Sequence, residues 1–247
     1  MNAPIFSITN LKVACSNCNL REICLPVGMP VSELEKVERI VANRRKIRRG
    51  ERLFRAGDKF DSLYAIRLGF LKSSVGATDG REQVTGFHMA GELVGLDGIS
   101  GQSHSCDVVA LEDTEVCVIP YERLEDVATS VPVLSMHLHK VMSREIVREH
   151  GVMLLLGSMH AEERLAAFLL NLSQRFEARG YSRTEFVLRM TRAEIGSFLG
   201  LKLETVSRLF SRFAQEGLIA VSQKRVRIVN AAGLRALVTG QGTSLEA

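Results

Sequence analysis

The 247-residue sequence has no uninterrupted apolar segment long enough to cross a membrane, which takes about 18 residues or more. Its first residues also lack the basic stretch that opens a secretory signal. These absences predict a soluble, cytoplasmic protein with no membrane partner. Thiols stay reduced in that compartment, so the five cysteines, an odd number, do not predict a disulfide framework.

Enzyme signatures are equally scarce. The sequence shows no pairing of a nucleophile with a base and no phosphate-binding loop, so nothing in it favours a catalytic function. Disorder over most of the chain is excluded as well, because 46% of the residues are apolar and supply ample material for a core. The sequence therefore predicts a folded protein that binds rather than catalyses.

Positive charge is concentrated towards the C-terminus. Residues 160–247 carry 13 Lys and Arg against 8 Asp and Glu, a net charge of +5, whereas residues 1–159 carry 19 against 20. A basic C-terminal module on a nearly neutral body is typical of a protein whose partner is a nucleic acid.

Changes in composition divide the chain into four regions. These are a cysteine-rich segment (1–30), a β domain (31–130), a long helix (131–159) and a C-terminal module (160–247). Ten glycines between positions 50 and 101 separate short apolar segments, as in an antiparallel β-roll or barrel with tight turns. The order of these regions predicts an α+β fold.

One segment of the β domain alternates cleanly, with Tyr64, Ile66, Leu68 and Phe70 separated by small or charged residues. This period of two predicts a strand that buries one face. The segment 115–120 predicts the last strand of the domain.

The long helix begins near Pro132, which we expect in the first helical turn behind a Ser130 cap. About 27 helical residues would span roughly 40 Å. Seven positions along it repeat at spacings of four and three: Ser135, His139, Met142, Ile146, Glu149, Met153 and Leu156. This repeat predicts a coiled-coil seam between two copies of the chain.

The C-terminal module contains a predicted helix-turn-helix between Thr191 and Phe210. Thr191 and Glu194 form a capping box that opens the first helix, and Gly200 supplies the turn before a second helix from about 203 to 215. Two strand candidates, 218–221 and 226–229, flank a basic turn and predict a β-wing. A polar stripe on a helix is often only solvated, but the basic wing and the concentrated charge favour DNA binding.

The second helix of this motif has two distinct faces. Val206, Leu209, Phe210 and Phe213 are predicted to point inward. The outward stripe includes Glu204, Ser207 and Arg208, of which arginine pairs with guanine and glutamate with cytosine in the major groove. Lys224 and Arg225 in the wing are candidate phosphate contacts.

Three cysteines crowd into ten positions: Cys15, Cys18 and Cys24. A fourth thiolate has to come from Cys106 or Cys117. Zinc sites usually add a second paired motif, which the six histidines here do not form, so the spacing favours an iron–sulfur cluster over zinc.

Several motifs together resemble the fumarate and nitrate reduction regulator (FNR) family, within the cyclic-AMP receptor protein superfamily. Beside the cysteine motif, the segments that match are 86–94, 116–122, 161–168 and 205–208. The resemblance extends from about residue 12 to 235. It implies a β-roll of the cyclic-nucleotide-binding type, a dimerisation helix and a winged helix-turn-helix.

For function, the resemblance implies an oxygen-responsive transcription regulator. An oxygen-labile [4Fe–4S] cluster would be held by Cys15, Cys18, Cys24 and Cys117, and its loss would return a DNA-binding homodimer to monomers. The base-reading residues of the family fall on Glu204, Ser207 and Arg208 and imply TTGAT-type half-sites on double-stranded DNA. RNA polymerase is a further partner that the family implies.

The seam of the family carries an acidic residue at the position of Glu149. Between Ile146 and Met153, this carboxylate would face its twin across a parallel dimer, where the two repel. We therefore expect Glu149 to keep the cluster-free protein monomeric, unless it lies just off the seam and faces solvent.

Relatives that bind cyclic nucleotides hold the phosphate with an Arg-Ser pair after their Gly-Glu-Leu segment. Here no arginine occurs between Glu82 and Tyr121, so we expect no cyclic nucleotide. His104 is predicted to lie in a turn or at the surface, and Cys106 to pack as a small apolar residue.

Two other functions stay open. One is a zinc- or small-molecule-responsive regulator of the same fold, in which the cysteines are structural. The other is an iron–sulfur electron-transfer protein, which would leave the helix-turn-helix without a role.

Overall fold

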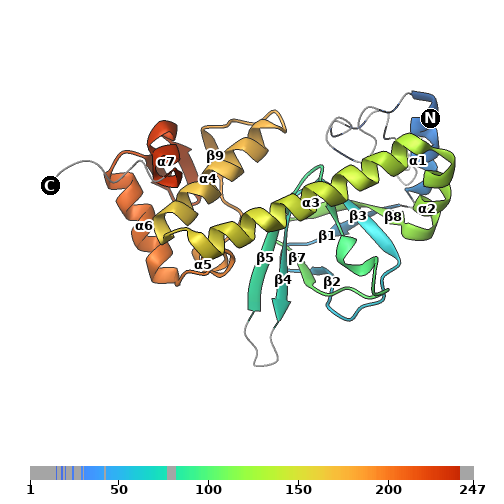
Figure 1. Cartoon of the computed structure of the whole chain (residues 1–247), viewed down its shortest axis with the longest axis horizontal. Helices are drawn as coiled ribbons and strands as arrows, with labels where there is room; N and C mark the ends of the chain where they lie inside the picture. The colour runs from blue at the N-terminus through green and yellow to red at the C-terminus, as the bar shows by residue number, and fades with distance from the viewer. Residues whose placement is uncertain are drawn as a thin grey trace, which may run out of the picture.

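A computed structural model describes residues 31–41, 43–76 and 82–239, together with Cys15, Cys18, Leu20, Cys24 and Met29. The chain folds into an N-terminal β-roll, a long connecting helix and a C-terminal domain of helices with a small sheet (Figure 1). The predicted α+β architecture is confirmed.

The β-roll consists of two four-stranded antiparallel sheets. Their strand orders are β1-β8-β3-β6 and β2-β7-β4-β5. The strands are β1 (Asn43–Ile47), β2 (Arg52–Phe54), β3 (Ser62–Leu68), β4 (Phe70–Gly76), β5 (Glu82–Met89), β6 (Leu93–Val94), β7 (Asp107–Ala110) and β8 (Thr114–Pro120), with a short 3₁₀ turn, η2 (Leu96–Gly98). The last strand falls where the sequence predicts it.

The alternating segment differs from its prediction. Gly69 has a positive φ of 98°, so β3 ends before it and Phe70 begins β4. Leu68 is 59% exposed, whereas Ala65 is buried beside Tyr64 and Ile66. β3 is an inner strand with a hydrophobic cluster on each face, so its burial does not alternate.

Three helices flank the roll: α1 (Val31–Ile40), α2 (Tyr121–Ser130) and α3 (Pro132–Ser158). Figure 1 shows α3 running from the α1 and α2 end to the C-terminal domain. Its 27 residues match the predicted length, and Pro132 opens it. The Ser130 cap is wrong, because Val131 is the capping residue and the Ser130 hydroxyl bonds to the Val127 carbonyl at 3.0 Å.

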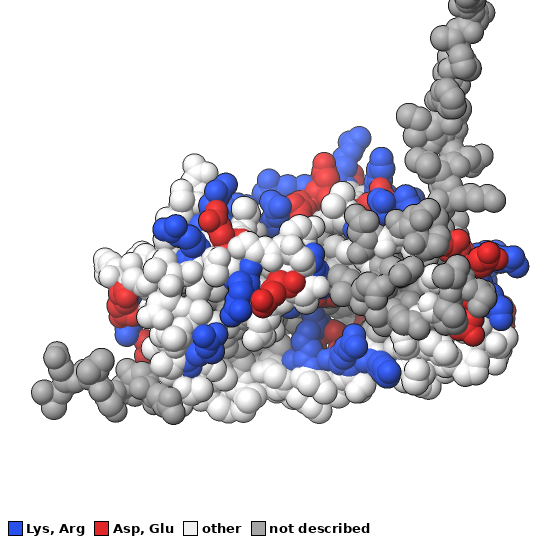
Figure 2. Space-filling model, turned by 90° about the horizontal axis from the view of Figure 1, so that it is seen from above, with Lys and Arg blue, Asp and Glu red and all other residues white. Residues whose placement is uncertain are grey.

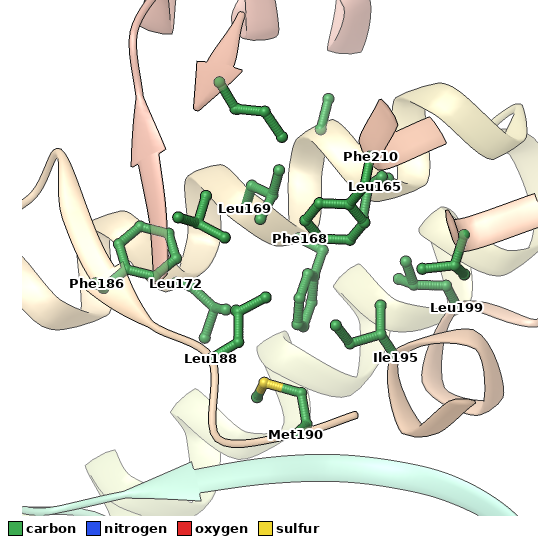
Figure 3. Close-up of a cluster of buried hydrophobic side chains, with 14 of the residues drawn as sticks. Leu165, Phe168, Leu169, Leu172, Phe186, Leu188, Met190, Ile195, Leu199 and Phe210 are labelled. Carbon is green, nitrogen blue, oxygen red and sulfur yellow. The ribbon is translucent and has the colours of Figure 1, made fainter. Parts of the chain in front are cut away.

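Up to residue 239, where the description ends, the C-terminal domain contains four helices and a three-stranded sheet of order β10-β11-β9. Its elements are α4 (Ala161–Glu177), β9 (Glu185–Val187), α5 (Arg192–Leu199), α6 (Leu203–Gln215), β10 (Ile219–Ser222), β11 (Arg225–Ile228) and α7 (Ala231–Val238). Helix α7 is not among the elements that the sequence pattern predicts. Figure 3 shows the core of this domain, where Phe168 and Leu169 of α4 face Leu188, Ile195 and Phe210.

The core of the C-terminal domain continues into the β-roll. Phe87 of β5 lies 6.0 Å from Phe168 and 5.3 Å from Phe198 between ring centroids, and Val84 and Met89 belong to the same cluster. The two parts therefore share one hydrophobic core.

The described surface is charged. On the face that Figure 2 shows, basic and acidic side chains lie beside one another at several places. Within the described ranges, no helix is long and apolar enough to cross a membrane.

Candidate nucleic-acid interface and cysteine centre

The helix-turn-helix is formed by α5 and α6. Thr191 caps α5: its hydroxyl accepts from the Glu194 N–H at 3.2 Å, and the Glu194 carboxylate accepts from the Thr191 N–H at 2.7 Å. Gly200 then turns the chain with a φ of +64°, and the Leu201 N–H bonds to the Gly196 carbonyl at 2.8 Å. The capping box and the turn glycine are thus where the sequence predicts them.

The two faces of α6 are also as predicted. Val206, Leu209, Phe210 and Phe213 are buried against the core of the domain. Glu204, Ser207 and Arg208 are exposed, and the Arg208 guanidinium bonds weakly to the Glu204 carbonyl at 3.4 Å. The stripe is therefore free to meet a groove, as a recognition helix requires.

The wing is formed by β10, β11 and the turn between them. Lys224 and Arg225 are exposed at this turn, and Gln223 takes a positive φ of 55° there. Arg225 forms an ion pair of 3.0 Å with Glu185 of β9. The sequence did not predict this pair, because the two residues are far apart in the chain and meet only through the pairing of β9 with β11. Part of the Arg225 charge is thereby compensated.

Arg164 of α4 connects the long helix to the helix-turn-helix. Its guanidinium donates to the carbonyls of Leu156 and Met159 at the end of α3 and to that of Leu199 at the end of α5, at 2.8 to 2.9 Å. These three carbonyls lie at the C-terminal ends of two helices, α3 and α5, where carbonyls lack an intrahelical partner. No sequence signal distinguishes this arginine from others on an amphipathic helix.

The four predicted cluster ligands line a single cavity. Cys15, Cys18 and Cys24 come from the N-terminal segment, and Cys117 comes from β8, about ninety positions later. Apolar residues complete the wall: Leu20, Val37, Val41, Ala65, Ile66 and Ile119, with Arg67. Folding thus brings all four thiols to one apolar place.

Burial disfavours thiolates in this cavity. It raises the pKa of Cys15 to about 12, and Cys117, Glu38 and Cys18 act in the same direction. Burial also raises the pKa of Cys117, against the neighbouring guanidinium of Arg44. Because thiolates are the metal-binding form, ligation here would release protons.

Within the described residues, no three His, Cys, Asp or Glu side chains are close enough to share one metal ion. A zinc ion, at about 2.3 Å from each sulfur, would need the sulfurs within about 4 Å of one another. A four-iron cluster is larger and takes four thiolates further apart. Four cysteine thiols are a donor set that either an iron–sulfur cluster or a zinc ion can use.

Cys106 lies away from this cavity. Its thiol donates to Asp97 at 3.5 Å, and burial together with this carboxylate raises its pKa to about 12. His104 lies in the irregular segment before β7, but a surface position is wrong: the residue is 3% exposed and its ring is stacked on Phe54, with ring centroids 3.6 Å apart. Asp97 is a polar partner of both side chains: its carboxylate accepts from the Cys106 thiol and lies 3.3 Å from the His104 ring.

The predicted seam is only partly exposed on α3. Ile146 and Met153 are 56% and 69% exposed, as an unpaired seam would be. The Glu149 side chain is 45% exposed and lies 3.6 Å from Arg148 of the same helix. Arg148 also pairs with Glu145, so the two carboxylates share one guanidinium.

A cavity of about 410 Å³ lies between the β-roll and α3. Its polar lining includes His88, Asp97 and Arg148. Burial lowers the pKa of His88 to about 3, with Arg148 acting in the same direction, so this ring is neutral. Arg148 was not predicted at this cavity, because α3 contributes it from outside the β domain.

Two domain families match the chain. A cyclic nucleotide-binding domain matches residues 44–130, and a Crp-like helix-turn-helix domain matches residues 163–237. Both matches cover the regions whose geometry is described above.

Several known proteins are similar over nearly their whole length. The transcriptional regulatory protein btr of Bordetella pertussis is 51% identical, over 91% of this chain and 93% of its own. The fumarate and nitrate reduction regulatory protein of Vibrio cholerae is 45% identical, over 91% and 90%. Among solved structures, FixK2 from Bradyrhizobium japonicum is 31% identical, with a TM-score of 0.74 over 80% of this chain and 97% of that one.

The close approach of α5 to the turn predicts a specific cost for a methyl group at Gly196. A Cβ there would lie 2.6 Å from the Leu201 carbonyl oxygen, so Gly196→Ala should lower the free energy of unfolding by about 1–3 kcal/mol in urea titrations. Gly157→Ala is the control, because a Cβ at this position would meet no neighbouring group within 4 Å. This substitution should stabilise α3 by up to about 1 kcal/mol. Equal stabilities for the two variants would contradict the close approach.

Proposed function

The chain belongs to the FNR family of transcription regulators, within the CRP/FNR superfamily, and from this premise we propose that it activates transcription when oxygen is scarce. It is a DNA-binding regulator and not an enzyme. In the proposed function, an iron–sulfur cluster controls whether the chain forms the dimer that binds DNA. The observation that carries the proposal is the single cavity lined by four thiols.

The proposed cluster ligands are Cys15, Cys18, Cys24 and Cys117. When bound, a [4Fe–4S] cluster would supply the oxygen-labile chemistry of the sensor. The apolar wall limits the access of water, and Arg44, paired with Cys117 in the β-sheet register, offsets part of the thiolate charge. Because Cys117 belongs to the β-roll, ligation would fasten the N-terminal segment to the sheet.

In the proposed DNA complex, Glu204, Ser207 and Arg208 read bases and the wing residues Lys224 and Arg225 contact phosphate. The exposure of all five residues supports these roles. The expected target is a palindrome of TTGAT-type half-sites, read in the major groove by one α6 from each protomer.

The proposed dimer forms along α3, through Ile146 and Met153. Both side chains are large, apolar and more than half exposed in the single chain. In the cluster-free protein, Glu149 opposes this contact, because a second carboxylate would approach it from the partner. The ion pair of Glu149 with Arg148 can offset part of the carboxylate charge and so reduce this repulsion.

RNA polymerase is the further partner we propose, as expected for an activator, and cytoplasmic location follows from both partners. We propose no role for a cyclic nucleotide, because Arg148 in the cavity under α3 is already paired with Glu145 and Glu149. Two alternatives remain for the signal that the regulator responds to. One is zinc bound by the cysteines in place of the cluster, and the other is a small molecule bound in the cavity under α3. An electron-transfer role is disfavoured by the complete helix-turn-helix.

Replacement of single cysteines tests the ligand set. In anaerobically purified protein, Cys117→Ala should lose most of the bound iron and sulfide, because one of four thiolates is missing. Cys106→Ala should keep them, since that thiol bonds to Asp97 and lies outside the cavity. Iron and sulfide analyses with absorption spectra before and after air check this, and the reverse pattern would transfer the ligand role to Cys106. Zinc without sulfide would favour the structural alternative.

Base reading by α6 is tested with Arg208→Ala. Loss of a bidentate contact should cost about 1–3 kcal/mol at the guanine position and relax specificity there. Lys224→Ala is the control for a phosphate contact: it should weaken all sequences alike and reduce the salt slope by about one. Binding titrations on specific and random duplexes distinguish the two, and equal losses on both for Arg208→Ala would exclude base reading.

Control of dimerisation is tested with Glu149→Ala. Without this carboxylate, Ile146 and Met153 should pack even in air, which increases both the dimer fraction and site-specific DNA binding. Sedimentation and gel shifts of aerobic protein measure these two quantities. A variant that stays monomeric in air would assign Glu149 only the intrachain bond to Arg148.

A further inference from the structure

A charged cluster joins the β-roll to the C-terminal domain at Glu92. This residue lies in the turn between β5 and β6, and Arg175 and Arg179 reach it from the end of α4. Arg175 Nη2 lies 2.7 Å from Glu92 Oε2 and Arg179 Nη2 lies 2.5 Å from Oε1. We refer to these three residues as the Glu92 clamp.

The clamp also holds the backbone of the turn. Arg175 donates to the Phe87 carbonyl and Arg179 to the Ala90 carbonyl, each at 2.6 Å. The Met89 N–H donates to the Glu92 carboxylate at 3.2 Å and closes the turn on itself. Every charged group of the clamp thus has several partners, as a well-buried ion cluster requires.

The clamp is ionised at physiological pH. Burial by itself raises the pKa of Glu92, but Arg175 and Arg179 outweigh it and hold the pKa below its usual range. The side chains of Arg179 and Glu92 are only 8% and 25% exposed, so salt and water screen this contact less than a surface ion pair.

The hydrophobic core holds the two domains in contact, whereas the clamp constrains their relative orientation. The contact of Phe87 with Phe168 and Phe198 keeps the domains together, but apolar burial is not directional. Charged hydrogen bonds are directional, and the clamp places them at the end of α4, next to the backbone of Phe87. They therefore fix the angle between the domains.

The segment that carries Glu92 lies beside the long helix as well. Leu93 and Val94 of β6, which follow Glu92, line the cavity under α3 together with Met142 and Ile146. The same short segment therefore lies next to the proposed dimer helix on one side and is bonded to the DNA-binding domain on the other.

From these contacts we propose that Glu92 is a positioning residue for DNA recognition. Through Arg175 and Arg179 it holds the DNA-binding domain at one angle to the β-roll and α3. Two recognition helices in a dimer then keep the separation of about 34 Å that adjacent major grooves require. This inference rests on the proposed binding of a palindrome by a dimer.

The main experiment compares Glu92→Gln with the wild type on two duplexes, one with the preferred spacing of half-sites and one with an extra base pair. Anaerobic binding should show that the preference for the first duplex falls, roughly two- to thirtyfold. Loss of folded protein would lower both affinities equally and leave their ratio unchanged. Glu112→Gln is the matched control, because it breaks a more exposed interdomain ion pair of 3.0 Å with Arg189 and should keep the ratio.

Hydrogen exchange of the aerobic proteins gives a second measurement that requires neither dimer nor DNA. Glu92→Gln should speed exchange in the segments 87–95 and 170–182 but not in β1, β3 and β8, whereas Glu112→Gln should leave 87–95 and 170–182 unchanged. Unchanged exchange in those segments, or a rise throughout the chain, would overturn the proposal. If the wild type shows no preference between the two duplexes, the proposed binding of a palindrome by a dimer is wrong. Hydrogen exchange then tests by itself whether Glu92 holds the two domains together.

Discussion

The packing of the β4–β5 sheet against α4 and α5 is the contact on which the other relations in this protein depend. Phe87 packs on Phe168 and Phe198, so the β-roll and the DNA-binding half share one core. The helix-turn-helix is thereby attached to the β-roll as well as to the end of α3. A change in the β-roll can then reach α6 without passing through a flexible linker.

Polar contacts complete this junction with directional bonds. Ser197 of α5 accepts from the Val84 N–H of β5 at 2.9 Å, and Lys72 of β4 lies 3.2 Å from Glu194, the acid of the α5 capping box. Arg164 of α4 also donates hydrogen bonds to backbone carbonyls at the ends of α3 and α5. Apolar burial supplies most of the attraction, and these bonds select one arrangement among those that bury similar area.

The cysteine cavity lies elsewhere on the molecule, against α1 and the β1-β8-β3 sheet. Any influence on DNA binding has to travel through the roll or along α3. The proposed dimer seam is suited to carry it, because Ile146 and Met153 are exposed apolar residues on a helix that ends beside Arg164. The cysteine cavity, the proposed dimer seam and the helix-turn-helix thus follow one another along the molecule.

Local sequence determined the capping box at Thr191, the faces of α6, the length of α3 and the last strand, since each depends on neighbours within a few positions. It also singled out the cysteines, although the resemblance supplied the choice of Cys117. Only the tertiary structure decided the burial of β3, the stacking of His104 on Phe54, the bond of Arg164 to Leu199 and the partners of Glu92. Those contacts join groups tens of residues apart in the sequence, which no local periodicity encodes.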